Sequence, residues 1–409
     1  MTFYFSEMSV SDRHGGGITL QRVLGEDLRR FDAFLHVSRF GSDLPPAEEI
    51  AGRSETRAMW SESNAVRRLI GRGNADWLSR REVIRRGHAR RIAKEWGRRF
   101  GSEDAPRALV CPQGALSLLT IAEIRRRHPL QYVTWMMDDH LLRWNGEAWE
   151  YPAGYHALMG KHLRDAEKVF AISPQLAAFY EKEFGVQAEV LFGSADVAGE
   201  PVWRSPSETG KPRLAYFGSI LAWQLDPLQA LAARLAGAGA TLDIFTPAAN
   251  PPAGLVEAGV KVLPSIPRDA VIHEMRRYDA VVLPISSRDA SRNMTEFNVA
   301  TKMSECLASG TMSLVLGPAN AAMVRYLEPY DAAAIIREPS LAGFEEVAAR
   351  LGDAVYRKQI LTNARRLVET QLSTEIMRRQ WRSAELFGDK SGVGSKSSVG
   401  EFSKNMALL

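Results

Sequence analysis

Short apolar runs alternate with amphipathic segments along the second half of the chain. The amphipathic segments have helical spacing, as at 227–236, 269–278 and 344–351. Near-continuous apolar strands separated by crossover helices are typical of a parallel sheet that is covered on both faces. The strands predicted in this half are 213–218, 241–245, 260–264, 279–284, 312–317 and 333–337.

The first half repeats this rhythm less regularly, with strands predicted at 2–7, 33–38, 108–112, 131–137, 168–173 and 189–193. A Gly-, Pro- and Ser-rich stretch at 193–213 separates the halves and is a plausible hinge. The fold class is therefore α/β, with two doubly wound Rossmann-like domains that face each other across a cleft. We expect domains at 1–198 and 213–372, a linker at 199–212, a helix at 373–388 that crosses back to the first domain, and a disordered tail at 389–409.

The composition fits a two-domain protein of a reducing compartment. At 409 residues the chain exceeds the usual size of a single core. Cys111 and Cys306 lie far apart in apolar contexts, which predicts neither a disulfide framework nor a metal cluster. The N-terminal stretch carries Glu7 and Asp12 and lacks a long apolar core, so it does not resemble a signal peptide. No run approaches the roughly 20 apolar residues of a spanning helix. We expect a cytoplasmic protein that is soluble or peripheral on the inner face of the membrane.

Positive charge is concentrated in one part of the first half. The net charge is +4, but twelve Lys and Arg face only three acids between Asn64 and Phe100. Nucleic acid, an anionic membrane surface or a phosphorylated substrate could each explain such a patch. We disfavour nucleic acid, because no recognised binding module or interleaved stacking aromatics accompany the charge.

A basic helix is predicted at 81–100, and two interpretations of it remain open. It could lie on anionic lipid with Trp96 or Trp77 near the interface. Alternatively, its apolar stripe packs on the domain and the arginines are solvated. The stripe consists of Ile84, Ala89, Ile92, Trp96 and Phe100.

The segment Thr301–Gly310, TKMSECLASG, is the most informative stretch of the sequence. It lies between two predicted strands, and Lys302 and Glu305 are three residues apart, which places them on one face of a helix. Such a helix would begin beside the carboxyl ends of parallel strands, where doubly wound sheets bind ligands. Lys302 could meet a diphosphate while Glu305 accepts hydrogen bonds from a ribose diol. A surface ion pair on an ordinary crossover helix is the alternative.

Glycine-rich turns follow the first strand of each half. Gly15, Gly16 and Gly17 precede a predicted helix, and their backbone N–H groups would suit an anion or a closely approaching sugar. A flexible surface turn is the alternative. The dinucleotide pattern G-x-G-x-x-G is absent. In the second half, Gly218 and Ser219 would face the cleft.

These features together resemble the GT-B-fold glycosyltransferases, within the broad retaining group that includes family 4. T-K-M-S-E-C-L-A-S-G is similar to the donor-binding pattern x-T-K-x-x-E-x-L-A-x-G of that family. The resemblance implies that Lys302 contacts the diphosphate of a nucleotide sugar and that Glu305 contacts its ribose hydroxyls, with Thr301 a further donor-binding residue. It also implies that Gly218 and Ser219 lie against the phosphates. The stretch 263–271, with Ile266, resembles the loop whose backbone contacts the base.

The chain departs from that family pattern in its charged residues. Many members carry two glutamates separated by seven residues, but the position that corresponds to the first glutamate is Phe297, and Glu296 is one position away. The Arg and Lys that many members place after the first C-terminal strand are also missing. Arg288 and Arg292, in the loop before the predicted helix, could supply that charge instead.

Asp139 and His140 follow a predicted strand of the first half and are the candidate catalytic residues there, together with Lys302 of the second half. Asp139 could act as the base or orient the acceptor, or one of Asp138 and Asp139 could cap a helix. A metal site would need a third ligand that the sequence does not identify. The family resemblance implies no metal and no cofactor, because protein cations and a helix N-terminus neutralise the leaving diphosphate.

The sequence therefore predicts a metal-independent, retaining glycosyltransferase, with its acceptor in the first domain and its nucleotide-sugar donor in the second. The acceptor would be a glycan or a polyprenyl-linked glycan of bacterial-type surface polysaccharide assembly. Two alternatives stay open: a nucleotide-sugar epimerase of the same fold, and a membrane-associated scaffold that binds nucleotide sugars without turnover.

Overall fold

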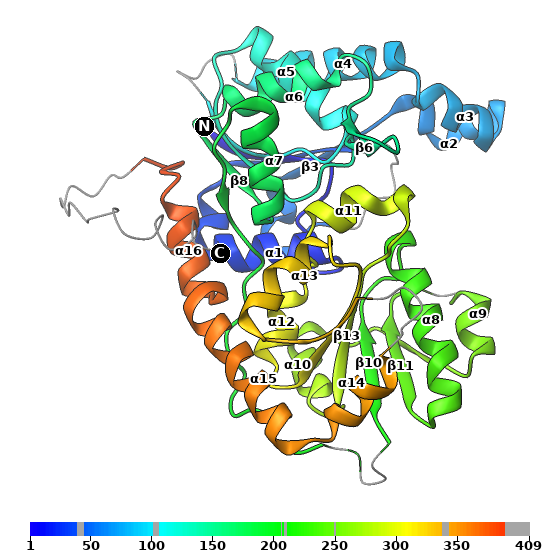
Figure 1. Cartoon of the computed structure of the whole chain (residues 1–409). Coiled ribbons are helices and arrows are strands. Elements are labelled where there is room, and N and C mark those ends of the chain that lie inside the picture. Colours follow the sequence, from blue (N-terminus) through cyan, green and yellow to red (C-terminus); the bar gives the residue numbers. More distant parts are fainter. Residues whose placement is uncertain are drawn as a thin grey trace.

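The computed structural model describes residues 1–38, 45–100, 106–205, 207, 211–248, 251–337 and 343–388. The tail predicted at 389–409 and the linker positions 206 and 208–210 lie outside these residues. Two parallel sheets form separate upper and lower lobes, each flanked by helices (Figure 1). This arrangement confirms the predicted fold class.

The sheet of the first lobe has seven strands in the order β3-β2-β1-β4-β5-β8-β9. Its central strands show little alternation of apolar and polar residues, because helices cover both faces of the sheet and the side chains on both faces are buried. Two elements were not predicted: the polar edge strand β3, which pairs with β2, and the hairpin β6–β7 that follows β5. The strands are β1 (Thr2–Ser6), β2 (Ala33–Ser38), β3 (Ser54–Ala58), β4 (Arg107–Cys111), β5 (Gln131–Met136), β6 (Arg143–Trp144), β7 (Trp149–Glu150), β8 (Lys168–Ala171) and β9 (Glu189–Val190).

The helices of the first lobe connect these strands as crossovers. The α-helices of the first lobe are α1 (Gly15–Leu24), α2 (Asn64–Ile70), α3 (Arg72–Ser79), α4 (Glu82–Phe100), α5 (Ala115–Arg127), α6 (Tyr155–Arg164) and α7 (Pro174–Phe184).

The sheet of the second lobe has six strands in the order β12-β11-β10-β13-β14-β15, and all six were predicted. They are β10 (Arg213–Phe217), β11 (Thr241–Thr246), β12 (Lys261–Pro264), β13 (Ala280–Pro284), β14 (Met312–Leu316) and β15 (Ala334–Ile336). The α-helices are α8 (Ala222–Ala238), α9 (Ala253–Glu257), α10 (Arg268–Met275), α11 (Arg292–Phe297), α12 (Met303–Ala308), α13 (Ala322–Leu327), α14 (Phe344–Leu351), α15 (Ala354–Leu367) and α16 (Thr374–Arg382).

The last helix returns to the first lobe, as predicted. The Trp381 indole N–H donates to the Asp27 carboxylate at 3.1 Å, and the Arg378 Nε donates to the Arg22 carbonyl at 2.9 Å. Trp381 is buried, so its large apolar surface contributes to holding α16 against α1. Figure 1 shows α16 beside the first lobe, connected to the second lobe through α15.

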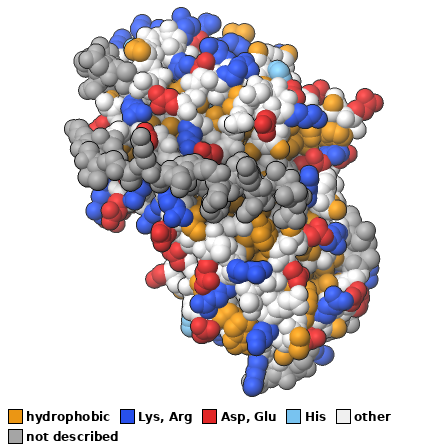
Figure 2. All heavy atoms as spheres, turned by 60° about the vertical axis from the view of Figure 1, so that its left-hand side comes forward, with side chains coloured by type: hydrophobic (Ala, Val, Ile, Leu, Met, Phe, Trp, Pro, Cys, Tyr) orange, Lys and Arg blue, Asp and Glu red, His pale blue; other side chains and the backbone are white. Residues whose placement is uncertain are grey.

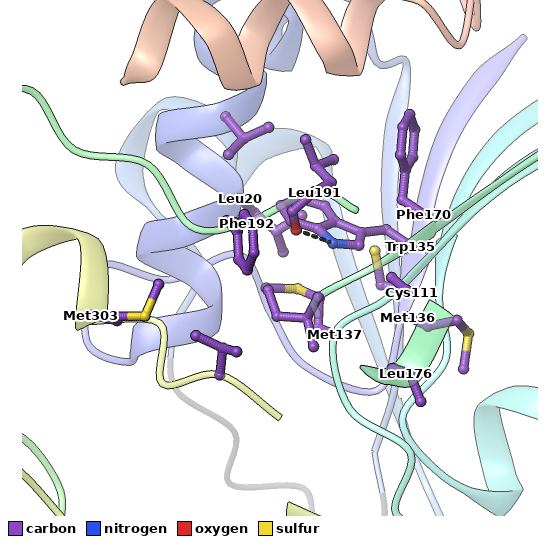
Figure 3. Close-up of a cluster of buried hydrophobic side chains, with 14 of the residues drawn as sticks. Leu20, Cys111, Trp135, Met136, Met137, Phe170, Leu176, Leu191, Phe192 and Met303 are labelled. Carbon is purple, nitrogen blue, oxygen red and sulfur yellow. Dashed lines mark hydrogen bonds between the residues drawn. The ribbon is translucent and has the colours of Figure 1, made fainter. Parts of the chain in front are cut away.

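The main apolar core runs through both lobes. Met303 of α12 belongs to the same buried cluster as Trp135, Leu191 and Phe192 of the first lobe (Figure 3). The Trp135 indole N–H donates to the Leu191 carbonyl at 3.1 Å, which satisfies a polar group inside this cluster. The two lobes are therefore packed together, with α12 at their junction.

The basic helix α4 exists as predicted, but its apolar stripe is not available to a membrane. Ala89, Ile92 and Trp96 are buried, and Trp96 packs edge-on against Phe5 while its indole N–H donates to Glu55. The expectation that Trp96 lies at a membrane interface is therefore wrong, because packing on the sheet already buries it. The side chain of Phe100 lies outside the described part of the chain. No helix within the described residues is long and apolar enough to cross a membrane.

Candidate active site at the junction of the lobes

Polar contacts join the two lobes where the strands of the first sheet end. The Ser173 hydroxyl donates to the Phe297 carbonyl at 2.6 Å, and the Asn293 amide donates to the Asp139 carbonyl at 3.1 Å. The Ser304 hydroxyl donates to the Gly193 carbonyl. All strand pairs within the two large sheets are parallel, so their carboxyl ends share one edge, where such folds bind ligands.

Lys302 lies immediately before α12 and points to the carboxyl end of β10. Its ammonium donates to the Phe217 carbonyl at 2.5 Å and to the Tyr216 hydroxyl at 3.3 Å, and it lies 4.6 Å from the centre of the Tyr216 ring. Both hydrogen bonds go to uncharged oxygens, so the positive charge remains available to an anion. The helix is shorter than predicted, and Lys302 occupies its N-cap position rather than its first turn.

Gly218 lies directly beside this ammonium. A Cβ at this position would overlap the Lys302 Nζ, and the φ of +134° belongs to a region that other residues rarely adopt. The neighbouring Ser219 is exposed, and its carbonyl accepts from the Tyr216 hydroxyl at 2.6 Å. The structure thus brings Lys302, Gly218 and Ser219 together, and their expected role at a diphosphate remains a prediction.

Glu305 lies one turn further along and faces the first lobe. Its carboxylate forms an ion pair of 2.5 Å with the guanidinium of Arg22 on α1, and both side chains are largely buried. Arg268, at the start of α10, interacts electrostatically with Arg22, Glu305 and Asp12, and partial burial lowers its pKa. Two arginines from opposite lobes therefore lie around the predicted ribose-binding carboxylate.

Neither arginine was identified from the sequence. Arg268 is in the stretch 263–271, which was singled out only for its backbone, and the nearby Ile266 is half-buried against the main core. Arg22 lies on the helix that follows the glycine-rich turn, and nothing in its local pattern shows that it reaches the other lobe. They add positive charge close to the motif in a chain whose β10–α8 turn and first residues of α8, at 218–225, contain none.

The glycine-rich turn packs directly against the other lobe. A Cβ on Gly15 would overlap the Thr301 hydroxyl, and a Cβ on Gly17 would overlap the backbone of Ser11. A Cβ on Gly16 would come 2.9 Å from the terminal methyl of Met8. His14 caps α1, because its Nδ1 accepts from the Gly17 N–H at 3.1 Å. The expected role of this turn as an anion or sugar site remains a prediction. The structure shows that its glycines let the backbone lie very close to neighbouring residues.

Asp139 is buried and held by four donors. One carboxylate oxygen accepts from the backbone N–H groups of Leu141 and Leu142 at 3.1 and 3.2 Å. The other accepts from the hydroxyls of Tyr151 and Tyr180 at 2.7 and 3.1 Å. Of the two roles open to Asp139, this arrangement favours the structural one, because both oxygens are fully engaged in shaping the turn.

Asp138 and His140 lie on either side of this anchored carboxylate. Burial raises the pKa of Asp138 to about 6, and its carboxylate accepts from Asn298 of the second lobe and from Gln113. His140 is exposed, and its backbone N–H donates to the Gln113 carbonyl at 3.3 Å. Of the candidate catalytic residues of the first lobe, His140 therefore remains accessible.

Glu7 is a further carboxylate at this edge that sequence reasoning did not select. It follows β1 and accepts from the Ser117 N–H at 2.7 Å, which caps the N-terminus of α5. Burial raises its pKa, and it interacts electrostatically with His140 and Arg85. Its place at the carboxyl end of a central strand was the available signal.

Arg292 does not have the surroundings expected of a phosphate ligand. Its guanidinium forms an ion pair of 2.5 Å with Glu296 and stacks 3.8 Å above the ring of Trp144 in the β6–β7 hairpin. Trp149 of the same hairpin packs against Phe297 with ring centres 4.8 Å apart. Arg292 thus joins α11 to the hairpin of the first lobe, and its expected role at the donor remains a prediction.

Among the residues that the structure describes, no group of three or more His, Cys, Asp or Glu side chains is placed to hold a metal ion. What the junction does offer is an ammonium beside a glycine at the end of β10, a carboxylate one turn away, and two nearby guanidinium groups. Such a set could bind a polyanion that also carries hydroxyl groups.

Solved glycosyltransferases share this architecture. A sucrose-phosphate synthase from Thermosynechococcus elongatus aligns with a TM-score of 0.65 at 13% identity, over 94% of this chain and 98% of that chain. HepE from Anabaena, in complex with UDP and glucose, aligns with a TM-score of 0.61 at 12% identity, over 94% and 98% of the two chains. WaaG, a glycosyltransferase involved in lipopolysaccharide biosynthesis, aligns with a TM-score of 0.56 at 15% identity, over 95% and 100%.

A scan against models of protein families and a search of curated proteins found no match. At these low identities the structural likeness concerns the arrangement of the chain. The resemblance drawn from the sequence is confirmed at that level: the chain has the two-lobed GT-B fold of these glycosyltransferases.

Proposed function

We propose that this protein is a glycosyltransferase that moves a sugar from a nucleotide-sugar donor to a glycan or polyprenyl-linked acceptor in bacterial-type surface polysaccharide assembly. The observation that carries the proposal is the position of Lys302 and Glu305 at the junction of the lobes. Lys302 lies against Gly218 at the end of β10, and Glu305 faces Arg22 of the opposite lobe.

The donor would bind with its diphosphate near Lys302 and Gly218 and its ribose near Glu305. Arg22 and Arg268 would supply the positive charge that the β10–α8 turn lacks, because both lie near Glu305. Solved structures of this fold include HepE with UDP-glucose and a trehalose-6-phosphate protein from E. coli with UDP-2-fluoro glucose. These titles support a nucleotide sugar as the ligand class to test first.

The transfer would break the bond between the sugar C1 and the diphosphate oxygen and form a bond between C1 and an acceptor hydroxyl oxygen. Lys302 would stabilise the charge that develops on the departing diphosphate. We propose a retaining reaction without a metal, in which the acceptor proton passes to the leaving phosphate oxygen. The engagement of Asp139 by four donors supports this route, because that carboxylate is not free to take a proton.

Calorimetric titration of the full chain with UDP, GDP, ADP and their glucose conjugates tests the donor site. We expect one of these ligands to bind, Glu305→Ala to weaken that binding and Lys302→Ala to lower turnover. Glu346→Ala and Lys358→Ala remove the same groups from exposed helix positions of the second lobe and should change neither property. A wild-type chain that binds none of these ligands, or unchanged binding by Glu305→Ala, would contradict the proposal.

The same ligands separate the transferase from its two rivals. A sugar isomer formed from the donor without an acceptor would identify an epimerase. Donor binding without transfer or hydrolysis across a broad panel of glycan and polyprenyl-phosphate acceptors would identify a binding scaffold instead.

A further inference from the structure

We propose that the 3-10 turn Trp60–Glu62, α2, α3 and the first turn of α4 form a docking surface for an anionic lipid membrane. We call this surface the α2–α3 face and define it by its four exposed large apolar side chains and the arginines between them. This inference does not depend on the proposed transfer reaction. The apolar members are Trp60, Leu69, Trp77 and Val83.

The α2–α3 face is unusually exposed for a pair of helices. Leu69 is 85% exposed, Val83 80% and Trp77 55%. None of the residues of α2 is buried, and α3 buries only Ala75 and Ser79. Short helices take most of their stability from burial of one face, so this pair has much apolar surface left to cover.

The position of the pair makes the face accessible to a large flat partner. Figure 1 shows α2 and α3 projecting from the edge of the upper lobe, away from the other sheet. They pack on each other, on the 3-10 turn Trp60–Glu62 and on the start of α4. A membrane could therefore approach the pair without disturbing the junction that contains Lys302 and Glu305.

The charge around these apolar side chains selects an anionic partner. Residues 60–91 contain nine arginines and three acids, a net charge of +6. Figure 2 brings forward the other side of the molecule, away from α2 and α3, and basic side chains with hydrophobic side chains between them lie on the upper lobe there as well. The Arg81 guanidinium lies 4.0 Å above the Trp77 ring, so a cation accompanies the exposed indole. Arginines around exposed Trp, Leu and Val side chains are typical of segments that lie in the membrane interface.

Lipid fits this chemistry better than a nucleic acid does. Trp60 and Trp77 offer rings on which a base could stack, but Leu69 and Val83, the most exposed of the four, are aliphatic. Single-stranded nucleic acids are bound largely by stacking on aromatic side chains. Acyl chains accept aliphatic and aromatic side chains alike, and anionic headgroups accept arginine. The face thereby replaces the buried stripe of α4 as the membrane contact.

Sedimentation of the full chain with vesicles tests the proposal. We expect partitioning onto vesicles of phosphatidylcholine mixed with phosphatidylglycerol, and little onto phosphatidylcholine alone. Leu69→Ser/Val83→Ser should weaken partitioning about tenfold for each lost apolar side chain. Arg68→Ala/Arg72→Ala should weaken it about fivefold for each lost charge. Both variants change exposed positions, so their melting temperatures should match that of the wild type.

Matched variants on the second lobe provide the controls. Val256→Ser/Val355→Ser removes two exposed valines there, and Lys261→Ala/Lys358→Ala removes two exposed cations. Neither should change partitioning. The proposal is overturned if the wild type does not bind the anionic vesicles, if the variants of the α2–α3 face bind like the controls, or if the face retains RNA but no vesicles.

Discussion

Gly15 offers a direct test of how closely the two lobes meet. Its position begins α1, and a Cβ added there would overlap the Thr301 hydroxyl of the second lobe. Within the first lobe the same substitution should do no harm, because alanine favours a helix over glycine by up to about 1 kcal/mol. Gly15→Ala therefore separates an effect on the lobe junction from an effect on local folding.

The size of the effect follows from overpacking a close contact. An added methyl group without room typically costs about 1–3 kcal/mol. At the middle of that range, about 2 kcal/mol, the packed arrangement becomes about thirtyfold less favoured relative to one with separated lobes. We expect small-angle scattering of Gly15→Ala to show a larger radius of gyration, with unchanged helix content by circular dichroism.

A rescue variant and a control make this prediction specific. Thr301→Ala in the Gly15→Ala chain removes the overlapping hydroxyl and should restore the wild-type radius, since the Thr301 Cβ is 3.6 Å from the added atom. The added Cβ of Gly16→Ala comes closest to the flexible end of Met8 and makes ordinary contact with His14, both within the same lobe, so its effect should be small. A Gly15→Ala chain whose radius and melting temperature equal those of the wild type would refute this reasoning.

Three further predictions concern buried charges. Asp139→Asn should lower the free energy of unfolding by about 2–4 kcal/mol in thermal denaturation, because an amide has one acceptor oxygen for four donors; an unchanged melting temperature would show that these bonds contribute little. Asp138 has a pKa raised to about 6 by burial, so between about pH 4 and 6 it is protonated in the native state and ionised in the unfolded state. Wild-type stability should therefore fall as pH rises through this interval, and Asp138→Asn should lack that component, worth at most about 3 kcal/mol, in melting curves recorded against pH. Arg357 is fully buried beside Asp279, so Arg357→Met should cost about 3–5 kcal/mol, whereas Arg350→Met at an exposed pair should cost under about 1 kcal/mol; equal melting temperatures of the two variants would contradict this difference.

The strands of the second lobe show which elements the pattern of apolar residues predicts well. Its strands are apolar on both faces and are bounded by turns, and every one was predicted within about two residues. Strand β3 was missed, because its sequence SETRA has Ala58 as its one apolar residue and none of the large apolar side chains that mark a buried strand. Its pairing is with the backbone of β2 at an edge of the sheet, and backbone hydrogen bonds leave no trace in the side-chain pattern.

The residues of the candidate site likewise include some that the sequence could locate and some that it could not. Lys302 and Glu305 could be located because they share one local motif, and Gly218 because it ends a strand. Arg22 could not, since its ion pair spans nearly three hundred residues and depends on how the lobes are oriented. Asp139 had a suitable position for catalysis, but only the packing of Tyr151 and Tyr180 reveals that its oxygens are occupied.

The segment that connects the lobes is anchored to the end of α12. The Ala198 N–H donates to the Ala308 carbonyl at 3.0 Å, and the Val202 N–H donates to the Gly310 carbonyl at 2.8 Å. Residues 198–202 should therefore travel with the second lobe as a rigid body, although their glycine and proline suggest a flexible joint. The chain between the lobes would then bend in the residues just before this segment, near Gly193. A disulfide between residues 198–202 and α12 would still allow the two lobes to move apart. A disulfide between positions 193 and 304 would prevent that movement.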